Sequence, residues 1–391
     1  MRDGKLVMGQ IGCGGFARDQ DLPNLTARGD VVVKYCCDPD AASAEWAAKT
    51  YGAERAVGDY GVVVDDPEVD FLKVSTPHDM HKPIALAAAA AGKHVFCEKP
   101  MAMSLEDCWE IVRAVQRSGI RFCVDMNRRM APAMQALRAR VRAQAESPRH
   151  SPWRYVEKVR EPMFEETCTN LLVRIQDESS SYRLVHLDPA HGGGQVIGES
   201  VHWLDLACWF FVPARPVEIT GWGSARLSHG INVRFSDGNA ATIVFDVCGT
   251  FDYPKEMYEV TGNAALFRSM FFVENRYYGM DGEERETFPL QADAYADKVR
   301  GEGFDAFMEK SRIRQRDAAG GIKASWGALV VDKGHRAMLG GFVEAVKTGG
   351  RTPCDELAGM RAVLLSNLAV QAIRERRAVA VPVDLYEPVF A

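Results

Sequence analysis

The sequence predicts an α/β fold in two parts: a mostly parallel sheet with helices on both faces, and then an α+β part with a large, mostly antiparallel sheet. Two observations lead to this fold class. Strand and helix patterns alternate over residues 1–127, as they do where helical crossovers connect parallel strands. Beyond residue 127, strand patterns follow one another with short turns between them, which favours antiparallel pairing. We therefore expect one domain over residues 1–127 and a second over residues 128–391.

The elements of the first part are short apolar runs that alternate with helical segments. The first strand, Leu6–Ile11, leads into a glycine-rich turn and a helix that reaches about Ala27. An alanine-rich helix is expected over Lys82–Ala91. The other expected elements are the strands Val31–Cys37, Asp70–Ser75, His94–Cys97 and Arg121–Asp125, and the helices Ala41–Tyr51 and Ser104–Ser118.

The second part begins with a helix over about Pro132–Ala145, followed by a stretch rich in Ser, Pro and Arg, Ser147–Arg154. Asp237-Gly238 supplies the turn chemistry of a hairpin between two of its strands. The tail returns to helix, and the C-terminal helix could pack back on the first domain. The expected strands are Trp153–Arg160, Val217–Gly223, Ile231–Phe235, Ala240–Val247 and Met257–Thr261, and the tail helices are Gly334–Thr348 and Cys354–Arg376.

Composition excludes several classes of function. The chain has 391 residues, of which 47% are hydrophobic and 26% charged, ordinary values for a globular protein with sizeable cores. A net charge of −6 gives no broad attraction for nucleic acid or an anionic membrane, so we expect neither as a partner. The start of the chain is short and charged, and no apolar run reaches the roughly eighteen residues of a membrane span. We therefore expect a cytoplasmic protein.

The ten cysteines are scattered, and none forms a C-x-x-C pair. Most lie within apolar runs, as Cys36, Cys37 and Cys208 do. This usage is typical of small buried hydrophobic residues in a reducing compartment, and it predicts neither a disulfide framework nor a zinc site. No cluster of His, Asp and Glu in the sequence has the spacing of metal ligands, so no metal is expected.

A cofactor signal follows the first strand directly. Gly12-Cys13-Gly14-Gly15-Phe16-Ala17 opens a helix and fits the G-x-G-x-x-G/A pattern of Rossmann dinucleotide-binding domains. The first glycine permits the tight turn, the second lets the backbone approach a pyrophosphate, and the final alanine lets helix and strand pack closely. The amino terminus of the helix stabilises the negative charge. The residues expected to bind the dinucleotide here are Gly12, Gly14, Gly15, Phe16 and Ala17.

The end of the second strand carries the acid that such a domain needs. Asp38 follows Val31–Cys37 directly, and its carboxylate can accept hydrogen bonds from a ribose diol and repel a 2′-phosphate. No Arg or Lys follows it in Pro39-Asp40-Ala41-Ala42. The pattern therefore favours NAD over NADP. The alternative is that Asp38 caps the following helix, and both roles can hold together.

Two further segments leave strands at the same edge of the sheet. Ser75-Thr76-Pro77-His78-Asp79-Met80-His81 should place a loop over the cofactor, although His81 could instead cap or pack the helix that it begins. Glu98-Lys99-Pro100 follows the strand His94–Cys97, where Lys99 could hold its ammonium against a reacting hydroxyl or carbonyl. The alternative for Lys99 is an ordinary solvated lysine. The candidate cofactor-binding residues of these segments are Thr76, Pro77, His78, His81 and Glu98.

With these pieces in order, the chain resembles the glucose–fructose oxidoreductase / inositol dehydrogenase family, often written Gfo/Idh/MocA, from Leu6 to about Val383. Its most specific stretch runs from Thr76-Pro77 through His81 and Gly92-Lys93-His94-Val95 to Glu98-Lys99-Pro100. In the family, the lysine of the Glu-Lys-Pro motif lies beside the nicotinamide ring and the reacting carbon. The match implies that role for Lys99.

A second block carries the resemblance into the second part of the chain. The segment from Gly192-Gly193-Gly194 to Asp205 is similar to the family's glycine-rich turn and the helix after it. The resemblance implies a substrate-facing role for His202 and matches Asp205 to the acid that commonly follows that histidine. Many members carry an aspartate four residues before the histidine, where this chain has Gly198 and places Glu199 next to it. Because residues three and four positions apart share a helix face, Glu199 could still reach the substrate.

For several residues the sequence leaves two interpretations open. Asn127 and Arg128, in a segment that resembles the family's Asn-Arg-Arg junction, could border the pocket or form an inter-domain hinge with ion pairs. Three tryptophans could stack on a sugar face, although aromatic core packing is the simpler interpretation. They are Trp203, Trp209 and Trp222.

The resemblance implies reversible hydride transfer between NAD and a secondary hydroxyl of a sugar, glycoside or cyclic polyol, with oxidation at carbon 3 of a glycoside as one version. We expect Lys99 to hydrogen-bond the reacting oxygen and His202 to act as general acid/base, oriented by Asp205. Lys99 is the alternative base, and Glu98 is expected to orient Lys99. The substrate-binding candidates are Lys99, Asn127, Arg128, Glu199, His202 and Asp205.

Two other functions remain open at this point. One is a redox-neutral NAD-dependent glycosidase or lyase, which would turn over without net NADH formation. The other is a non-enzymatic dinucleotide-binding sensor, which would need neither Lys99 nor His202. The exposed face of an antiparallel sheet usually needs cover, so we also expect a homodimer or homotetramer formed through the second domain.

Overall fold

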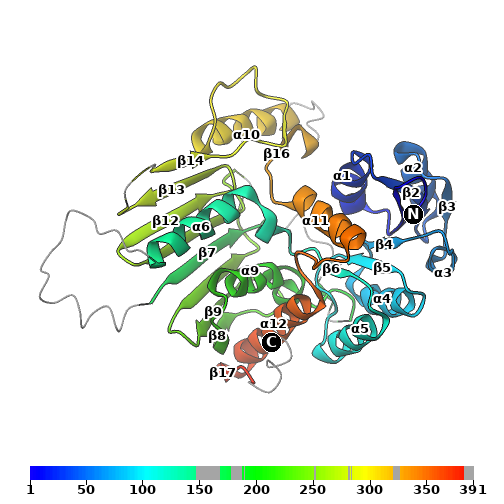
Figure 1. Cartoon of the computed structure of the whole chain (residues 1–391). Coiled ribbons are helices and arrows are strands. Elements are labelled where there is room, and N and C mark those ends of the chain that lie inside the picture. Colours follow the sequence, from blue (N-terminus) through cyan, green and yellow to red (C-terminus); the bar gives the residue numbers. More distant parts are fainter. Residues whose placement is uncertain are drawn as a thin grey trace, which may run out of the picture.

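The computed structural model describes residues 1–146, 168–177, 187–188, 190–250, 252–280, 282, 284–319 and 326–382. It contains a six-stranded and a nine-stranded sheet, which lie side by side with helices α11 and α12 between them (Figure 1). The expected strand Trp153–Arg160 and the stretch Ser147–Arg154 lie outside the described residues. No helix in the described ranges is long and apolar enough to cross a membrane.

The six-stranded sheet is parallel throughout and has the order β3-β2-β1-β4-β5-β6. The strand order changes direction between β1 and β4, so the carboxyl ends of these two strands flank the crevice where doubly wound sheets bind ligands. The first part of the predicted fold is therefore confirmed. The strands are β1 (Leu6–Ile11), β2 (Val31–Cys37), β3 (Arg55–Val57), β4 (Phe71–Val74), β5 (His94–Cys97) and β6 (Phe122–Val124).

The helices around this sheet start and end where their capping residues dictate. The Ser104 side chain accepts a hydrogen bond from the Asp107 backbone N–H at the start of α5, and Gly119 ends the same helix with φ +69°. The short strand β3 and the helix α3 were not predicted. The helical segments are η1 (Ala17–Asp21), α1 (Leu22–Thr26), α2 (Ala41–Tyr51), α3 (Tyr60–Val64), η2 (His78–Met80), α4 (His81–Ala90), α5 (Leu105–Ser118) and η3 (Asn127–Met130).

The nine-stranded sheet has the order β14-β13-β12-β11-β7-β10-β9-β8-β17. Its neighbours are antiparallel except for β7 and β10, so the prediction of a mostly antiparallel sheet is confirmed. The predicted hairpin is the β9–β10 pair, with Arg234 opposite Ala240. The strands are β7 (Asn170–Gln176), β8 (Pro216–Gly223), β9 (His229–Phe235), β10 (Ala240–Asp246), β11 (Glu256–Gly262), β12 (Ala265–Met270), β13 (Glu274–Tyr278), β14 (Arg285–Thr287) and β17 (Val379–Ala380).

One face of the large sheet is covered by helices, and among the described residues the other face, here called the open face, has exposed side chains such as Leu172. Side chains on the covered face, such as Val173 and Ile243, pack in one core with Trp203 and Leu365. On the open face Trp222 remains 57% exposed. The expected homo-oligomer stays a prediction. The other elements are α6 (Pro132–Glu146), η6 (Val196–Ser200), α9 (Val201–Phe211), α10 (Phe304–Ala319), η7 (Trp326–Ala328), α11 (His335–Thr348), α12 (Glu356–Glu375) and a small sheet of β15 (Ala292–Asp293) and β16 (Leu329–Val330).

The last two long helices complete the core of the first sheet. The Phe342 ring on α11 contacts the rings of Phe71 and Phe96 edge-on, each at 5.4 Å between centroids. On α12, a Cβ at Gly359 would lie 2.5 Å from Val124 Cγ2, so only glycine allows this close approach to β6. The other end of α12 reaches the large sheet, where Ile373 lies against Gly221 of β8.

We predict that Phe342→Ala lowers the free energy of unfolding by about 3–5 kcal/mol, because it opens a cavity between α11 and two strands of the first sheet. Urea unfolding followed by circular dichroism measures the change. Glu344→Ala, two residues along the exposed side of the same helix, is the control and should change stability by less than about 0.5 kcal/mol. Equal effects of the two substitutions would contradict this role of α11.

Candidate active site

The glycine loop after β1 has the shape that a dinucleotide needs. Gly12 has φ +86°, and a Cβ there would lie 2.3 Å from the Ser75 carbonyl oxygen. A Cβ at Gly14 or Gly15 would meet no atom within 4 Å, so the backbone there is open to a ligand. Phe16 is 41% exposed beside the loop. The observed loop therefore fits a bound pyrophosphate at the start of a helix.

Asp38 lies against this loop. Its Oδ2 accepts a hydrogen bond from the Cys13 backbone N–H at 2.8 Å, and its Oδ1 accepts one from the Asp40 N–H at 2.9 Å. The cap of α2 is Asp40, whose side chain accepts a hydrogen bond from the Ala42 N–H. The alternative role of Asp38 as the cap of this helix is therefore wrong, and its position beside the loop fits a ribose contact.

The segment after β4 links three parts of the site. The ring nitrogens of His81 lie 2.7 Å from the Pro100 carbonyl oxygen and 3.1 Å from that of Thr76, and burial lowers the pKa of His81 to about 4. His81 is fully enclosed, so the arrangement is that of the packing histidine that was its alternative. His78 reaches further, with Nδ1 3.0 Å from the Gly192 carbonyl oxygen in the second glycine-rich turn.

Lys99 connects the two halves of the candidate site. Its Nζ donates hydrogen bonds to the Gly198 carbonyl oxygen and to Glu199 Oε1, both at 2.7 Å. Burial alone would raise the pKa of Glu199, but the ammonium groups of Lys99 and Lys255 outweigh it and hold this pKa well below its usual range. The structure thus brings together Lys99 and the acid that stands beside the family's usual aspartate position.

His202 lies on α9 in the same region and is only 6% exposed. Burial and then the charges of Arg128 and Lys99 lower the pKa of His202 well below its ordinary value, so the ring is neutral near pH 7. Within the described ranges, its Nδ1 is a buried polar atom with no hydrogen-bond partner. A neutral imidazole with an unmatched nitrogen can accept a proton from a ligand.

Glu98 does not hold Lys99, which corrects one expectation. Its Oε1 accepts a hydrogen bond from Lys73 Nζ at 2.7 Å, and Lys73 also pairs with Asp21 Oδ1 at 3.1 Å. Lys73 is fully buried in β4, and burial raises the pKa of Glu98 well above its usual range although Lys73 opposes the rise. The sequence reasoning missed Lys73, because a lysine inside an apolar strand pattern carries no motif.

Asp205 does not orient His202, which corrects a second expectation. It forms a buried ion pair with the Arg129 guanidinium, whose Nε lies 2.6 Å from Oδ2. Asn127 and Arg128 also have structural partners. Asn127 Nδ2 donates to the Lys333 carbonyl oxygen at 2.8 Å, and Arg128 binds both carboxylate oxygens of Glu256 at 2.7 and 2.8 Å. These contacts fit the hinge with ion pairs that was the alternative for Asn127 and Arg128.

The tryptophans differ in their surroundings. Trp203 is fully buried, and its Nε1 donates to the Tyr258 hydroxyl at 3.2 Å, so it is a core residue as the simpler interpretation held. Trp209 lies under the Arg138 guanidinium at 4.2 Å, and Trp222 is on the open face of the large sheet. Lys255, Glu256 and Lys333 also lie in this region, and they were not predicted because no motif or period marks them.

We predict that Asp205→Leu lowers the free energy of unfolding by about 3–5 kcal/mol, because it leaves the buried Arg129 charge without its partner. The double variant Arg129→Met/Asp205→Leu should recover most of the loss, since it removes both charges together. Urea unfolding of the two variants measures this coupling. A single variant with unchanged stability would contradict a structural role for Asp205.

Comparisons with known proteins agree with this geometry. Residues 6–126 match the family model GFO_IDH_MocA, described as an oxidoreductase family with an NAD-binding Rossmann fold, which supports a nicotinamide dinucleotide as cofactor. The chain is 30% identical over 261 residues to a 1,5-anhydro-D-fructose reductase of Ensifer adhaerens, covering 65% of this chain and 72% of the relative. It is 35% identical over 146 residues to an inositol 2-dehydrogenase of Acidothermus cellulolyticus, covering 37% of this chain and 42% of that relative.

Solved structures support the fold. An NAD-binding oxidoreductase from Klebsiella pneumoniae superposes with a TM-score of 0.71 at 20% identity, over 97% of this chain and 99% of that one. The glycine loop and the Glu98-Lys99-Pro100 segment lie within the residues that match the family model, and solved oxidoreductases share the fold. The chain belongs to the Gfo/Idh/MocA family of oxidoreductases.

Proposed function

We propose that this protein transfers a hydride reversibly between NAD and a secondary hydroxyl group of a sugar, glycoside or cyclic polyol. One observation carries the proposal: the Lys99 ammonium, which follows strand β5 of the cofactor sheet, donates a hydrogen bond to Glu199, three residues before the buried His202. A neutral imidazole can take a hydroxyl proton, and an ammonium and a carboxylate can hydrogen-bond the hydroxyl groups of a polyol. The named relatives, among them an inositol 2-dehydrogenase, act on substrates of this class.

Each residue of the site has a separate role in the oxidation. NAD, when bound, accepts the hydride that leaves the substrate carbon. The neutral His202 ring takes the hydroxyl proton, and the Lys99 ammonium donates a hydrogen bond to the oxygen that becomes the carbonyl. Glu199 has lone pairs available for a neighbouring hydroxyl group. Lys99 is the alternative base, and in that case His202 would only position the substrate.

A substrate screen tests this function directly. The purified protein with NAD and a panel of sugars, glycosides and inositols should form NADH, followed by its absorbance, with at least one class of compound. The position of the new carbonyl in the product then identifies the oxidised carbon, including carbon 3 of a glycoside. If no compound in the panel is oxidised and none of their keto forms is reduced with NADH, the proposal is wrong.

We predict that Lys99→Ala and His202→Ala each lower kcat by about 10²–10⁴ on the substrate that the screen identifies, because each removes a group that handles the reacting oxygen or its proton. NAD binding, measured by calorimetry, should survive both changes. His191→Ala, at an exposed histidine that pairs with Asp188, is the control and should keep near-normal turnover. Normal turnover in Lys99→Ala would refute the assignment.

The pH profile separates the two candidate bases. Since the pKa of His202 lies well below its ordinary value, His202 is already deprotonated near neutrality and loses its base function only when the pH falls through that lowered pKa. We predict that kcat/KM for oxidation stays level as the pH is lowered from about 8 to 6.5. A fall over that window would show that a different group is the base.

We also propose that the cofactor is NAD rather than NADP. Asp38 is held at the glycine loop by the Cys13 N–H, where its charge would repel a 2′-phosphate. Arg18 reaches the same corner, but its Nε donates to the Cys13 carbonyl oxygen and its guanidinium lies over the Trp46 ring. We predict that Asp38→Asn lowers the ratio of kcat/KM for NAD to that for NADP by about tenfold, the effect of about 1.4 kcal/mol of lost repulsion.

The control for this change is Asp40→Asn, which removes a nearby charge but preserves the helix cap, because Asn caps about as well as Asp. It should leave the cofactor ratio near that of the wild type. If both variants shift the ratio equally, the preference comes from the general charge of this corner and not from Asp38.

A further inference from the structure

In the part of the chain that the structure describes, a cluster of ion pairs in the candidate substrate region holds one more cation than acids. Four cations and three acids lie together between the His202 helix and strand β11. Asp332 is next to Lys333 in sequence, but no ion pair among the described residues joins it to these cations, and its Oδ1 accepts a hydrogen bond from the Gly334 N–H. Among the described residues, the members of this charged cluster are the cations Lys99, Arg128, Lys255 and Lys333, and the acids Asp177, Glu199 and Glu256.

Most of the charged cluster forms matched pairs. Lys99 pairs with Glu199, and Lys255 pairs with Asp177 at 2.5 Å while its Nζ also lies 3.4 Å from Glu199. These two lysines and two acids balance one another. Any surplus charge must therefore come from the residues around Glu256.

The Glu256 carboxylate is satisfied without Lys333. The Arg128 guanidinium binds both of its oxygens, and the Tyr258 hydroxyl donates to Oε2 at 2.5 Å. Lys333 Nζ adds a further contact at 3.0 Å to Oε1. One carboxylate thus serves two cations, and the ammonium, which has three N–H donors, retains donors that Glu256 cannot use.

Lys333 also lies in the right place for a substrate contact. Two residues further along, the His335 ring contacts the Phe16 ring edge-on at 5.4 Å, next to the glycine loop. Glu256, which accepts a hydrogen bond from Lys333 Nζ, also accepts one from Nε1 of Trp203, the residue after His202. The Lys333 side chain is 23% exposed, and its Nζ also lies 4.9 Å from the centre of the Phe271 ring.

The local electrostatics favour an added anion. Burial is the largest cause that lowers the pKa of Lys333, and although Glu256 opposes it, the charges of Arg128 and Lys255 lower this pKa further. A carboxylate bound to the Lys333 ammonium would offset the burial of this charge and its repulsion by Arg128 and Lys255. The surplus is a single positive charge, which matches one carboxylate better than a phosphate group of about −1.5 to −2.

We infer that Lys333 binds a carboxylate on the substrate, so that the preferred substrates are sugar acids and not neutral sugars. This inference rests on the proposed hydride transfer and adds the substrate class. The carboxylate would lie between the ammonium of Lys333 and the hydroxyl groups that Glu199 and Lys99 contact. The recognition would depend on the charge of residue 333 and not on the length of its side chain alone.

Matched substrate pairs that differ only in the carboxylate test the inference. The pairs are methyl α-D-glucopyranoside with methyl α-D-glucopyranosiduronate, and D-galactose with D-galacturonate, each with saturating NAD. We expect the wild type to oxidise at least one acid with a kcat/KM about tenfold or more above that of its neutral partner. Lys333→Met should abolish this preference, mainly by raising KM for the acids. Lys333→Arg should retain it.

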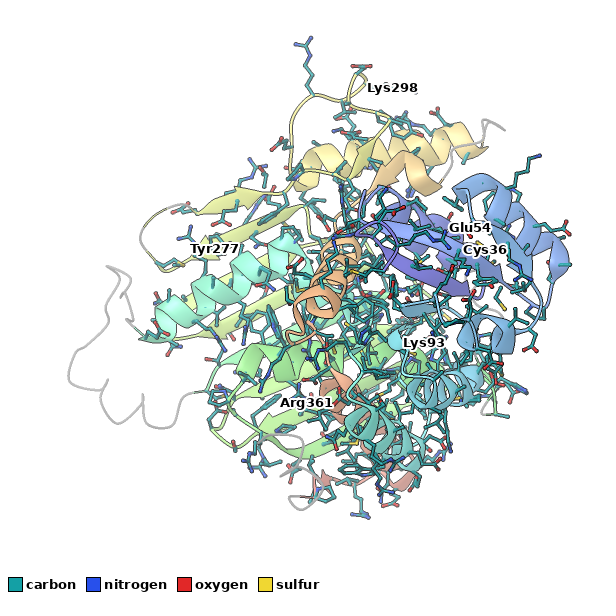
Figure 2. The ribbon with its side chains drawn as sticks, turned by 45° about the vertical axis from the view of Figure 1, so that its right-hand side comes forward. Cys36, Glu54, Lys93, Tyr277, Lys298 and Arg361 are labelled. Carbon is teal, nitrogen blue, oxygen red and sulfur yellow. The ribbon has the colours of Figure 1, made fainter. Side chains whose placement is uncertain are left out.

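The matched control is Lys298→Met. Lys298 is 54% exposed, pairs with Asp317 and lies at the outer edge of the molecule (Figure 2), so its loss should leave the preference intact. A wild type that does not prefer the acids, or a preference that persists in Lys333→Met, would overturn the inference.

If no compound is oxidised, the proposed function fails and a binding measurement decides the role of Lys333. Calorimetric titration of the NAD-loaded protein with methyl α-D-glucopyranosiduronate should then show binding that Lys333→Met loses and Lys298→Met keeps. Absent binding, or equal binding by the wild type and Lys333→Met, would overturn the inference on its own.

Discussion

Charge that is buried at the junction of the two sheets must be paired, and this constraint decides what each polar residue there does. An unpaired ion in a low-dielectric interior is strongly disfavoured, so ion pairs form across the junction wherever the chain places a charge. Arg129 therefore pairs with Asp205, and Arg128 pairs with Glu256. Within the first sheet, Lys73 pairs with Glu98. Lys99 is the member of this set whose partner, Glu199, remains partly exposed. The side chains that remain available for catalysis are those whose charges or hydrogen-bonding atoms are not fully paired.

The low dielectric constant of the same region also suits the two groups proposed to act in catalysis, His202 and Lys99. A neutral imidazole next to cations resists protonation, which suits a base that must be ready near neutral pH. The ammonium of Lys99 is fixed by a carbonyl and a carboxylate, so it need not reorganise when an oxygen develops charge. The site thus combines a cation that follows strand β5 of the first sheet with an uncharged proton acceptor on helix α9. The pairing of charges elsewhere keeps both in place.

The sequence predicted the parts of the fold that periodicity and local motifs determine. β1, β2, β5 and the hairpin of β9 and β10 appear where their patterns placed them, because apolar runs and an Asp-Gly turn are local signals. β3 has three residues that are mostly exposed, and no pattern marks it. The partners that were predicted for Glu98 and Asp205 were wrong for another reason, because their true partners are distant in sequence. Lys73 lies 25 residues before Glu98, and Arg129 lies 76 residues before Asp205, so only the fold brings each pair together. The glycine loop and Lys99 were found because their motifs are contiguous.

The packing of α11 and α12 on the first sheet has a consequence for how the chain folds. Met338, Phe342 and Val363 belong to the same apolar core as β1, β4 and β5. When the first 127 residues leave the ribosome, this core lacks a wall that is encoded more than two hundred residues later, since α11 starts at His335. The nascent first sheet would expose Phe71 and Phe96 until the C-terminal helices arrive. The cofactor half of the molecule is thus discontinuous in sequence, and it reaches its final form only after α11 and α12 have been synthesised.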